Sequence, residues 1–590
     1  MNQLTTIFSE NMDKNNILTE YPRPNLLRDS YINLNGYWNY AFTNTEEIPM
    51  NYDGNILVPF SPEAKLSGVE RILIPDESLW YYRTFHTPNM KNGERLILHF
   101  GAVDQYARVF INGHMVKEHM GGYLPFSVEI TSYLEEKENS IHVYVRDVTD
   151  SSYHTRGKQK LECSGMFYTP QSGIWQTVWM EVVPAVYIND LKVTPLFDDS
   201  KVRIQCFVVG DEEQANLYCF VEIYDGKNMV AKELLRKEEA YSKDIEIKNV
   251  KPWSPESPHL YTINISLLHD KVLSYVGMRK YSIGKDEKGI TRLFLNNKPY
   301  FHNGLLDQGY WPEGLYTAPT DEALRYDIIK AKELGFNMLR KHAKVEPLRW
   351  YYHCDKIGML VWQDMVNGGS NYNSNFVTYF PNVLPILADY IKDNNYHLFS
   401  RRDKEGKEEY MLELKDMISS LYHFTSIAMW VPFNEGWGQF DSLKVVDEIR
   451  KLDKTRTIDH ASGWFDQKGG DVKSHHIYFT RFRFTPEDRA VILSEFGGYV
   501  YRVDKHFYSN KSYGYRTYKT KGDLTTAYKR LYEKKIIPAM NKCLSASVYT
   551  QLTDIEEEIN GLLTYDRKVL KIDDKVLKEI NKKLRYKTER

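Results

Sequence analysis

The chain has 590 residues, which is too long for one hydrophobic core, so about three to four domains are expected. Its composition is 42% hydrophobic and 26% charged, and the formal net charge of −2 argues against non-specific nucleic-acid or membrane binding. The five cysteines are scattered without metal-ligand spacing, and neither a signal-like N-terminus nor a long apolar run is visible. We therefore expect a cytoplasmic protein without a metal, a cofactor or a transmembrane helix.

Residues 1–185 are expected to form a jelly-roll β-sandwich. Short apolar or alternating runs at 95–100, 107–112 and 140–145 have strand length, and Asn112-Gly113 is a typical hairpin turn. Residues 186–283 contain a second block of short strands, whose length suits an immunoglobulin-like β-sandwich.

Residues 284–590 alternate between strands and helices and predict a (β/α)8 barrel. The stretch 321–335 has an apolar helical stripe, with Thr320 or Asp321 as its cap and Gly335 as its stop; 440–452 and 523–536 are similar. The stretch 366–405 is longer than a βα loop requires and is a candidate rim or lid. The eight expected strands are 300–307, 337–342, 359–365, 427–435, 457–463, 472–478, 490–498 and 545–551.

Two glutamates close expected strands four and seven. Glu435 follows IAMWVPFN and Glu495 follows VILS, so each carboxylate comes where a buried strand leaves the core. Catalytic groups of such barrels occupy these strand ends. A solvated loop glutamate is a fair alternative for either residue alone and a poor one for the pair. Two carboxylates facing each other are what the cleavage of a glycosidic bond requires, one as acid and one as nucleophile.

The chain resembles glycoside hydrolase family 2 over nearly its whole length. The similarity rests on SLWYYRTF (78–85), ARVFING (107–113), SGIWQTVWMEVV (172–183), PWSPESPHLYTI (252–263) and VGMRK (276–280), together with Asn-Glu at 434–435 and Ser-Glu-Phe-Gly at 494–497. The resemblance implies a retaining β-glycosidase with Glu435 as acid/base and Glu495 as nucleophile. It also implies that Asn434 binds the sugar 2-hydroxyl, that Arg340 orients the nucleophile and that Tyr478 lies beside it; an ordinary packed tyrosine is the alternative for Tyr478.

Further polar or aromatic residues close the remaining strands and are candidates for binding hydroxyls or stacking on the sugar ring. A purely structural hydrogen-bonding role is the alternative for each. They are Asp307, His342, Asp364, Trp464, His475, His476, Tyr549 and Gln551.

The sugar is less well defined than the chemistry, because the family patterns vary here. Residues 340–344 lack the Arg-x-x-His-Tyr of galactosidases and glucuronidases, and 362–364 is closer to a mannosidase-like pattern. The Asn-x-Lys motif that holds a glucuronide carboxylate is represented by Asn560 alone, although Lys568 and Lys571 keep an acid sugar open. Our order is β-galactoside, then β-glucuronide or galacturonide, then β-mannoside, with an arabinoside also open.

The expected partner is a carbohydrate, without nucleic acid or membrane, and the resemblance leaves a homo-oligomer open. The long 366–405 segment favours release of one terminal sugar, and we expect this segment and Asp364 to set sugar specificity. A non-catalytic carbohydrate-binding protein on a degenerate barrel is the alternative class. The two intact glutamates argue against it.

Overall fold

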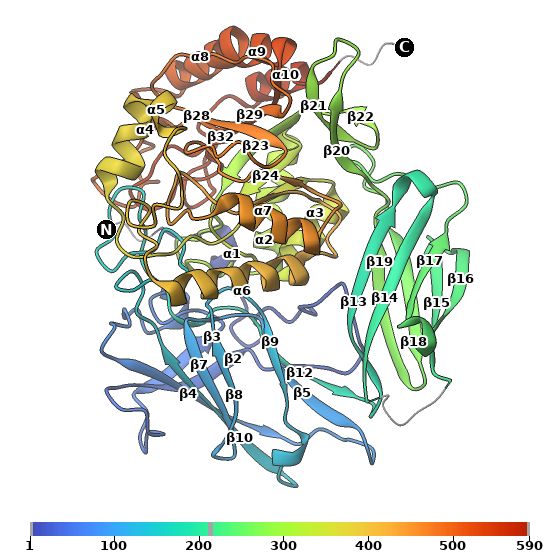
Figure 1. The fold of residues 1–590 in the computed structure, drawn as a ribbon. Coiled ribbons are helices and arrows are strands. Elements are labelled where there is room, and N and C mark those ends of the chain that lie inside the picture. The colour runs from blue at the N-terminus through green and yellow to red at the C-terminus, as the bar shows by residue number, and fades with distance from the viewer. Residues whose placement is uncertain (1–3, 211–215, 587–590) are drawn as a thin grey trace.

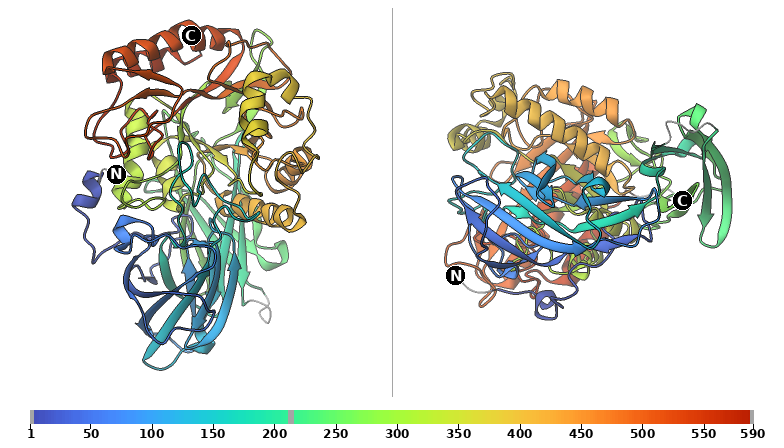
Figure 2. Two further views of the ribbon diagram at one scale, coloured as in Figure 1. Left: turned by 90° about the vertical axis from the view of Figure 1, so that its left-hand side faces the viewer. Right: turned by 90° about the horizontal axis from the view of Figure 1, so that it is seen from below.

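The computed structural model describes residues 4–210 and 216–586. Two β-sandwiches precede a parallel α/β barrel, as predicted. In Figure 1 the first sandwich lies below the barrel and the second lies to its right, and both views of Figure 2 show the same three bodies. No helix within these described ranges is long and apolar enough to cross a membrane.

The first sandwich packs two antiparallel sheets around a core that includes Trp38, Tyr81 and Phe100. The predicted strands at 95–100, 107–112 and 140–145 are β5, β7 and β10. One sheet has the order β3 (Gly54–Val58), β2 (Gly36–Thr43), β4 (Ser78–His86), β10 (Glu138–Arg146), β7 (Tyr106–Ile111) and β8 (His114–Met120). The other has the order β1 (Tyr31–Asn33), β12 (Val178–Val183), β5 (Arg95–Phe100) and β9 (Phe126–Glu129).

The second sandwich buries alternate residues of its strands, as in Tyr261–Leu267, where every second side chain is inside. Its sheets have the orders β13 (Tyr187–Leu196), β14 (Lys201–Val209), β17 (Ser242–Glu246) and β16 (Asn228–Arg236), β15 (Tyr218–Asp225), β18 (Tyr261–Leu267), β19 (Asp270–Val276). A small sheet of β20 (Tyr281–Lys285), β21 (Thr291–Leu295) and β22 (Lys298–Pro299) leads into the barrel.

The barrel is one eight-stranded sheet whose neighbouring strands are all parallel, and its strands confirm the eight that the sequence predicts. In sheet order they are β27 (Thr457–Ile458), β26 (Ile427–Val431), β25 (Leu360–Asp364), β24 (Met338–Lys341), β23 (His302–Asp307), β32 (Leu544–Thr550), β29 (Ala490–Gly497) and β28 (Val472–Ile477). Strands five and six, β27 and β28, form its two edges.

The helices that cover the barrel follow the predicted periodicity. In the first of them the Thr320 side chain accepts a hydrogen bond from the Ala323 amide at 3.1 Å, as the cap predicts. The helix predicted over 523–536 begins at Lys521 and continues through a π-helical turn to Lys542. The main helices are α2 (Asp321–Glu333), α3 (Leu348–Ile357), α6 (Lys404–Leu421), α7 (Ser442–Leu452), α8 (Lys521–Leu531) and α10 (Asp574–Lys583).

Two crossovers of the barrel lack a helix. The segments 459–471 and 478–489, which follow strands five and six, are described throughout and contain none. At the edge between these strands, side chains replace part of the missing backbone pairing: the Gly463 amide donates to the Ser474 hydroxyl at 3.4 Å, and the hydroxyls of Ser462 and Ser474 lie 3.4 Å apart.

The 366–405 segment is a packed rim of the barrel. It contains η5 (Asn375–Tyr379), α4 (Phe380–Val383) and α5 (Pro385–Ala388), which lie at the left edge of Figure 1. The rings of Phe376 and Phe399 lie 5.1 and 5.0 Å from that of Phe465, which follows strand five. The segment therefore supports the loop that carries Trp464 and Phe465.

A loop of the first sandwich reaches the barrel and holds the start of this rim. The Arg156 amide donates to the Asn367 carbonyl at 3.2 Å, and Thr155 forms a β-bridge with Gly368. Thr155 also donates to the Glu413 carboxylate on α6 at 2.7 Å. The first sandwich and the barrel therefore share one interface beside the open end of the barrel.

Candidate functional site

Glu435 leaves strand four through a strained turn. Its backbone has φ +54°, which non-glycine residues rarely adopt, and Gly436 follows with φ +73°. The Glu435 amide donates to the Ser462 carbonyl at 2.9 Å, which ties this turn to the loop after strand five. The carboxylate remains 13% exposed at the end of an otherwise buried strand.

Glu495 faces the barrel axis because strand seven contains a bulge. Ala490 and Ile492 pack inside the barrel and Val491 and Leu493 pack outside, so strict alternation would send Glu495 outward. The register with β28 shifts at this point, where His475 pairs with Leu493 and His476 with Glu495. The extra residue turns the glutamate inward, and bulges of this kind recur beside active sites.

The Glu495 carboxylate lies beside three side chains that donate hydrogen bonds or lower its pKa, namely those of Arg340, Tyr478 and His476. Arg340 Nη1 donates to one oxygen at 3.1 Å, and the Tyr478 hydroxyl donates to the other at 2.6 Å. Burial by itself raises the pKa of Glu495, but the charges of His476 and Arg340 outweigh it and lower the pKa to about 2. Glu495 is therefore ionised at neutral pH.

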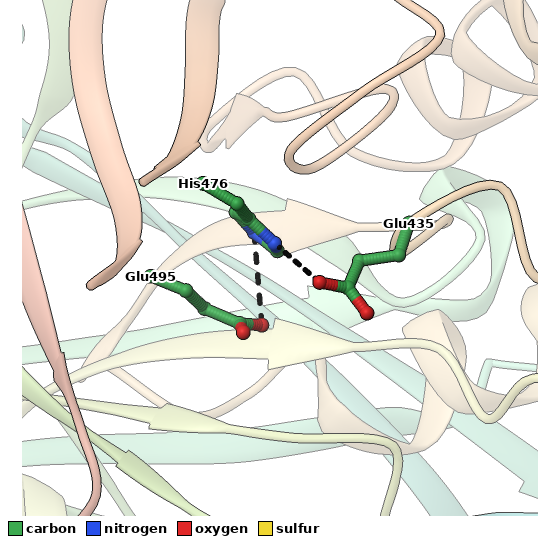
Figure 3. A group of neighbouring side chains, drawn as sticks. All are labelled: Glu435, His476 and Glu495. Atoms are coloured by element: carbon green, nitrogen blue, oxygen red, sulfur yellow. Dashed lines mark hydrogen bonds and ion pairs between the residues drawn. The ribbon is translucent and has the colours of Figure 1, made fainter. Parts of the chain in front are cut away.

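His476 lies between the two glutamates (Figure 3). Its Nδ1 is 2.9 Å from a Glu435 oxygen, and its Nε2 is 3.6 Å from a Glu495 oxygen. One donor atom of each of the three side chains lies within 4.8 Å of the other two, which is close enough to hold a cation. Such an ion would occupy both carboxylates at once.

Arg340 is fully buried and links Glu495 to two neighbouring side chains, those of Asp364 and Asn434. Its guanidinium donates to both Asp364 oxygens at 3.0 Å, and one nitrogen also donates to the Asn434 side-chain oxygen at 2.8 Å. His342 Nδ1 lies 2.7 Å from an Asp364 oxygen. Burial raises the pKa of Asp364 and lowers that of His342 far below its usual value. Asp364, expected to bind sugar, contacts Arg340 and His342 with its carboxylate oxygens.

Several buried polar atoms around the glutamates have no hydrogen-bond partner in the described chain. They are Asn434 Nδ2, His342 Nε2 and Trp437 Nε1. Leaving a buried polar atom unpaired costs roughly 1–3 kcal/mol, so such atoms mark where a polar ligand is complementary. Trp464, whose ring centroid lies 5.5 Å from that of His476, adjoins the same centre.

Lys158, from the first sandwich, reaches this centre and had no signal in the sequence. It is 8% exposed, and its ammonium forms neither a hydrogen bond nor an ion pair within the described ranges, although its charge helps to lower the pKa of Glu495. The ammonium lies 5.8 Å from the centroid of the Trp437 ring. A Cβ on the preceding Gly157 would lie 3.0 Å from the Ala343 carbonyl oxygen, so Lys158 enters between the loops after strands two and four.

Four candidates do not join this centre. Asp307 extends outward from strand one and forms an ion pair with Lys341 at 2.7 Å. Tyr549 likewise faces outward and packs edge-on against Phe496, with ring centroids 5.7 Å apart. Strand alternation explains both placements.

The other two are His475 and Gln551. His475 packs edge-on against Phe484 at 5.6 Å, and burial lowers the pKa of His475 to about 4. The Gln551 side chain accepts from Gln308 at 2.6 Å and donates to Asn560 at 2.9 Å, in a buried amide chain. His476, the neighbour of His475, occupies the central position instead.

Models of one protein family match all three parts of the chain. They are described as glycosyl hydrolases family 2, sugar binding domain, over residues 67–184; glycosyl hydrolases family 2 over 186–279; and glycosyl hydrolases family 2, TIM barrel domain, over 291–535.

Relatives and solved structures agree with this assignment. A β-galactosidase of Thermoanaerobacter pseudethanolicus is 26% identical over 74% of this chain and 55% of its own length, and a putative β-glucuronidase of Formosa agariphila is 26% identical over 54% and 38%. The chain thus spans about half or less of these relatives. A β-D-glucuronidase of Dictyoglomus thermophilum superposes with a TM-score of 0.72 at 19% identity, covering 96% of this chain and 98% of its own. A β-galacturonidase of Eisenbergiella tayi superposes at 0.68 and 18%, covering 96% and 98%; both likenesses show the fold. The chain belongs to glycoside hydrolase family 2.

Proposed function

We propose that the protein is a retaining exo-β-glycosidase that removes one terminal sugar by double displacement. The arrangement of Glu435 and Glu495 around His476 is the observation that carries this proposal. An oxygen of each carboxylate lies within 4.8 Å of the other, whereas inverting enzymes hold the two groups farther apart to leave room for a water molecule.

The two glutamates have different roles because their surroundings differ. Glu495, ionised and held by Arg340 and Tyr478, attacks the anomeric carbon and forms a glycosyl ester. Glu435 gives a proton to the leaving oxygen and then takes one from the water that hydrolyses the ester. Asn434 binds the sugar, and Arg340 holds the nucleophile. The packed rim at 366–405 closes one side of the open barrel end, which supports the exo mode.

Leaving groups distinguish the two roles. Glu435→Ala should keep far more activity on a dinitrophenyl glycoside than on an alkyl glycoside, because an activated phenolate leaves without a proton. Added azide should rescue this variant and yield the β-glycosyl azide. Glu495→Ala should lose activity on both substrates by several powers of ten and give an α-azide. Azides of the opposite configuration would exchange the roles, and an inverted first product from the native enzyme would exclude double displacement. A native protein inactive on every aryl glycoside would favour the binding-protein alternative.

A β-galactoside is the first candidate sugar, since several similar curated proteins are β-galactosidases. One observation favours a second candidate, a β-linked uronic acid. Lys158 is a nine-tenths buried cation that acts on the Glu495 charge at a distance but forms no ion pair in the described ranges, and a sugar carboxylate would supply that pairing. The two lysines that the sequence suggested for binding a sugar carboxylate already form ion pairs: Lys571 with Asp554 at 2.7 Å and Lys568 with Glu10 at 2.8 Å.

Replacement of Lys158 by Met decides between these sugars. If the ammonium binds a sugar carboxylate, kcat/KM should fall by about 10- to 150-fold for an aryl β-galacturonide or glucuronide and much less for the galactoside, since charged hydrogen bonds contribute about 1.5–3 kcal/mol. Lys160→Met is the matched control, because Lys160 lies over the Phe167 ring instead. Equal losses on charged and neutral sugars would mean that Lys158 acts only through Glu495.

A further inference from the structure

A basic groove adjoins the catalytic centre, on the side of the barrel where the helix after strand six is missing. It has a volume of about 880 Å³ and lies between the loop that follows β28, the segments 497–499 and 516–519, and side chains of α8. Tyr478, which donates to Glu495, lines its inner end. In Figure 1 the labels β28, β29 and α8 mark this region at the top of the barrel.

Cations dominate the lining of this groove. Six basic side chains and one acidic side chain, Asp523, line it. All six cations are exposed, and none forms an ion pair with an acid in the described parts of the chain. The protein as a whole has a net charge of −2, so this excess is local. The six are Arg481, Arg516, Lys519, Arg530, Lys534 and Lys535.

Aromatic rings line the same groove. Phe479 is 62% exposed, and Tyr478 and Tyr518 lie nearby in the lining. An exposed ring and two half-buried rings that share a lining with unpaired cations suit a chain of sugar rings that carries negative groups, because the rings stack on pyranose faces and the cations meet the charges. The volume is within the usual range for ligand sites.

We propose that this groove binds an acidic glycan, one whose sugars carry carboxylate or sulfate groups, as a site separate from the catalytic pair. The site retains the polymer from which the terminal sugar is removed. Its binding does not depend on hydrolysis, so it can be measured whether or not the glycosidase proposal holds.

The test uses the full chain and two triple variants of equal charge. Arg530→Ser, Lys534→Ser and Lys535→Ser together remove three cations of the groove. Lys521→Ser, Lys529→Ser and Lys582→Ser remove three exposed cations outside its lining, two of them on the same helix. Calorimetry measures binding of oligogalacturonate, a sulfated oligosaccharide, neutral dextran and a single-stranded oligonucleotide at two salt concentrations.

The groove variant should bind at least one acidic glycan about tenfold more weakly, with a smaller salt dependence, while the control variant stays within about twofold. Small aryl glycosides should be processed alike by all three proteins. The two glycans distinguish carboxylate from sulfate recognition. Equal weakening in both variants, comparable binding of neutral dextran, tighter binding of the oligonucleotide, or no binding of either acidic glycan would each overturn the proposal.

Discussion

Replacing Tyr478 by Phe removes one hydrogen bond to the nucleophile and leaves the ring in place. The hydroxyl donates to a Glu495 oxygen at 2.6 Å, and the ring stacks on Tyr515 with centroids 3.9 Å apart. The Thr550 hydroxyl, 2.9 Å from that of Tyr478, supports the same orientation. The variant therefore tests the contact with little change in packing.

The loss should be visible in the chemical step. A hydrogen bond to an ionised group contributes about 1.5–3 kcal/mol, and each 1.36 kcal/mol corresponds to about a tenfold change in rate. If the contact is made fully in the transition state, kcat/KM on an aryl glycoside should fall by about 10- to 150-fold, with an unchanged thermal unfolding midpoint. The hydroxyl also stabilises ionised Glu495, so its removal should raise the pKa of Glu495 and move the acid limb of the pH–rate profile upward.

Tyr515→Phe is the matched control, because the structure shows no hydrogen bond from its hydroxyl to Glu435 or Glu495. It should stay within about threefold of the native enzyme. If Tyr478→Phe loses less than threefold, or if both variants lose equally, the hydroxyl does not hold the nucleophile and the assignment of this contact is wrong.

Two further predictions concern buried acids. Asp364→Asn weakens the clamp on Arg340 and should lower kcat/KM by similar factors, about 10- to 150-fold, on every sugar that the enzyme accepts, whereas a shift in relative rates among sugars would favour a specificity role for Asp364. Burial raises the pKa of Glu413 to about 8, so its stabilising contribution is complete below about pH 4.5 and is lost as the pH rises toward 8. Glu413→Gln stays neutral and should unfold at a higher temperature than the native protein at pH 8 but at the same temperature near pH 4.5; an equal change at both values would contradict this linkage.

The barrel could be predicted because its strands and helices carry local signals. Eight apolar runs alternate with helical stripes, and each run was found at its place in the sheet. The glutamates followed from the same pattern, since a strand that leaves a core must end in polar residues. The sequence pattern could not predict that Glu495 points inward, because alternation from Ala490 and Ile492, which lie inside the barrel, would point it outward. The bulge in strand seven depends on pairing with β28, which one segment of sequence does not encode.

The same limit separates His475 from His476. Both close strand six, and only the pairing geometry tells which ring faces the axis. Asp307 and Tyr549 fall on the outer face for the ordinary reason of alternation, and could have been recognised by counting from Leu306 and Val548, which lie inside. Lys158 had no such signal, since it comes from a loop in a different domain.

The entry of Lys158 between two barrel loops has a consequence for how the protein can be divided and recombined. The unit of catalysis does not coincide with the barrel, because a cation beside the nucleophile and the clamp on residues 367–369 both come from the first sandwich. An excised barrel would keep both glutamates and lose part of their electrostatic surroundings. Exchange of the N-terminal domain between relatives would in turn alter the site itself, so sugar preference in such chimaeras is expected to follow the loop at 153–158 as well as the barrel.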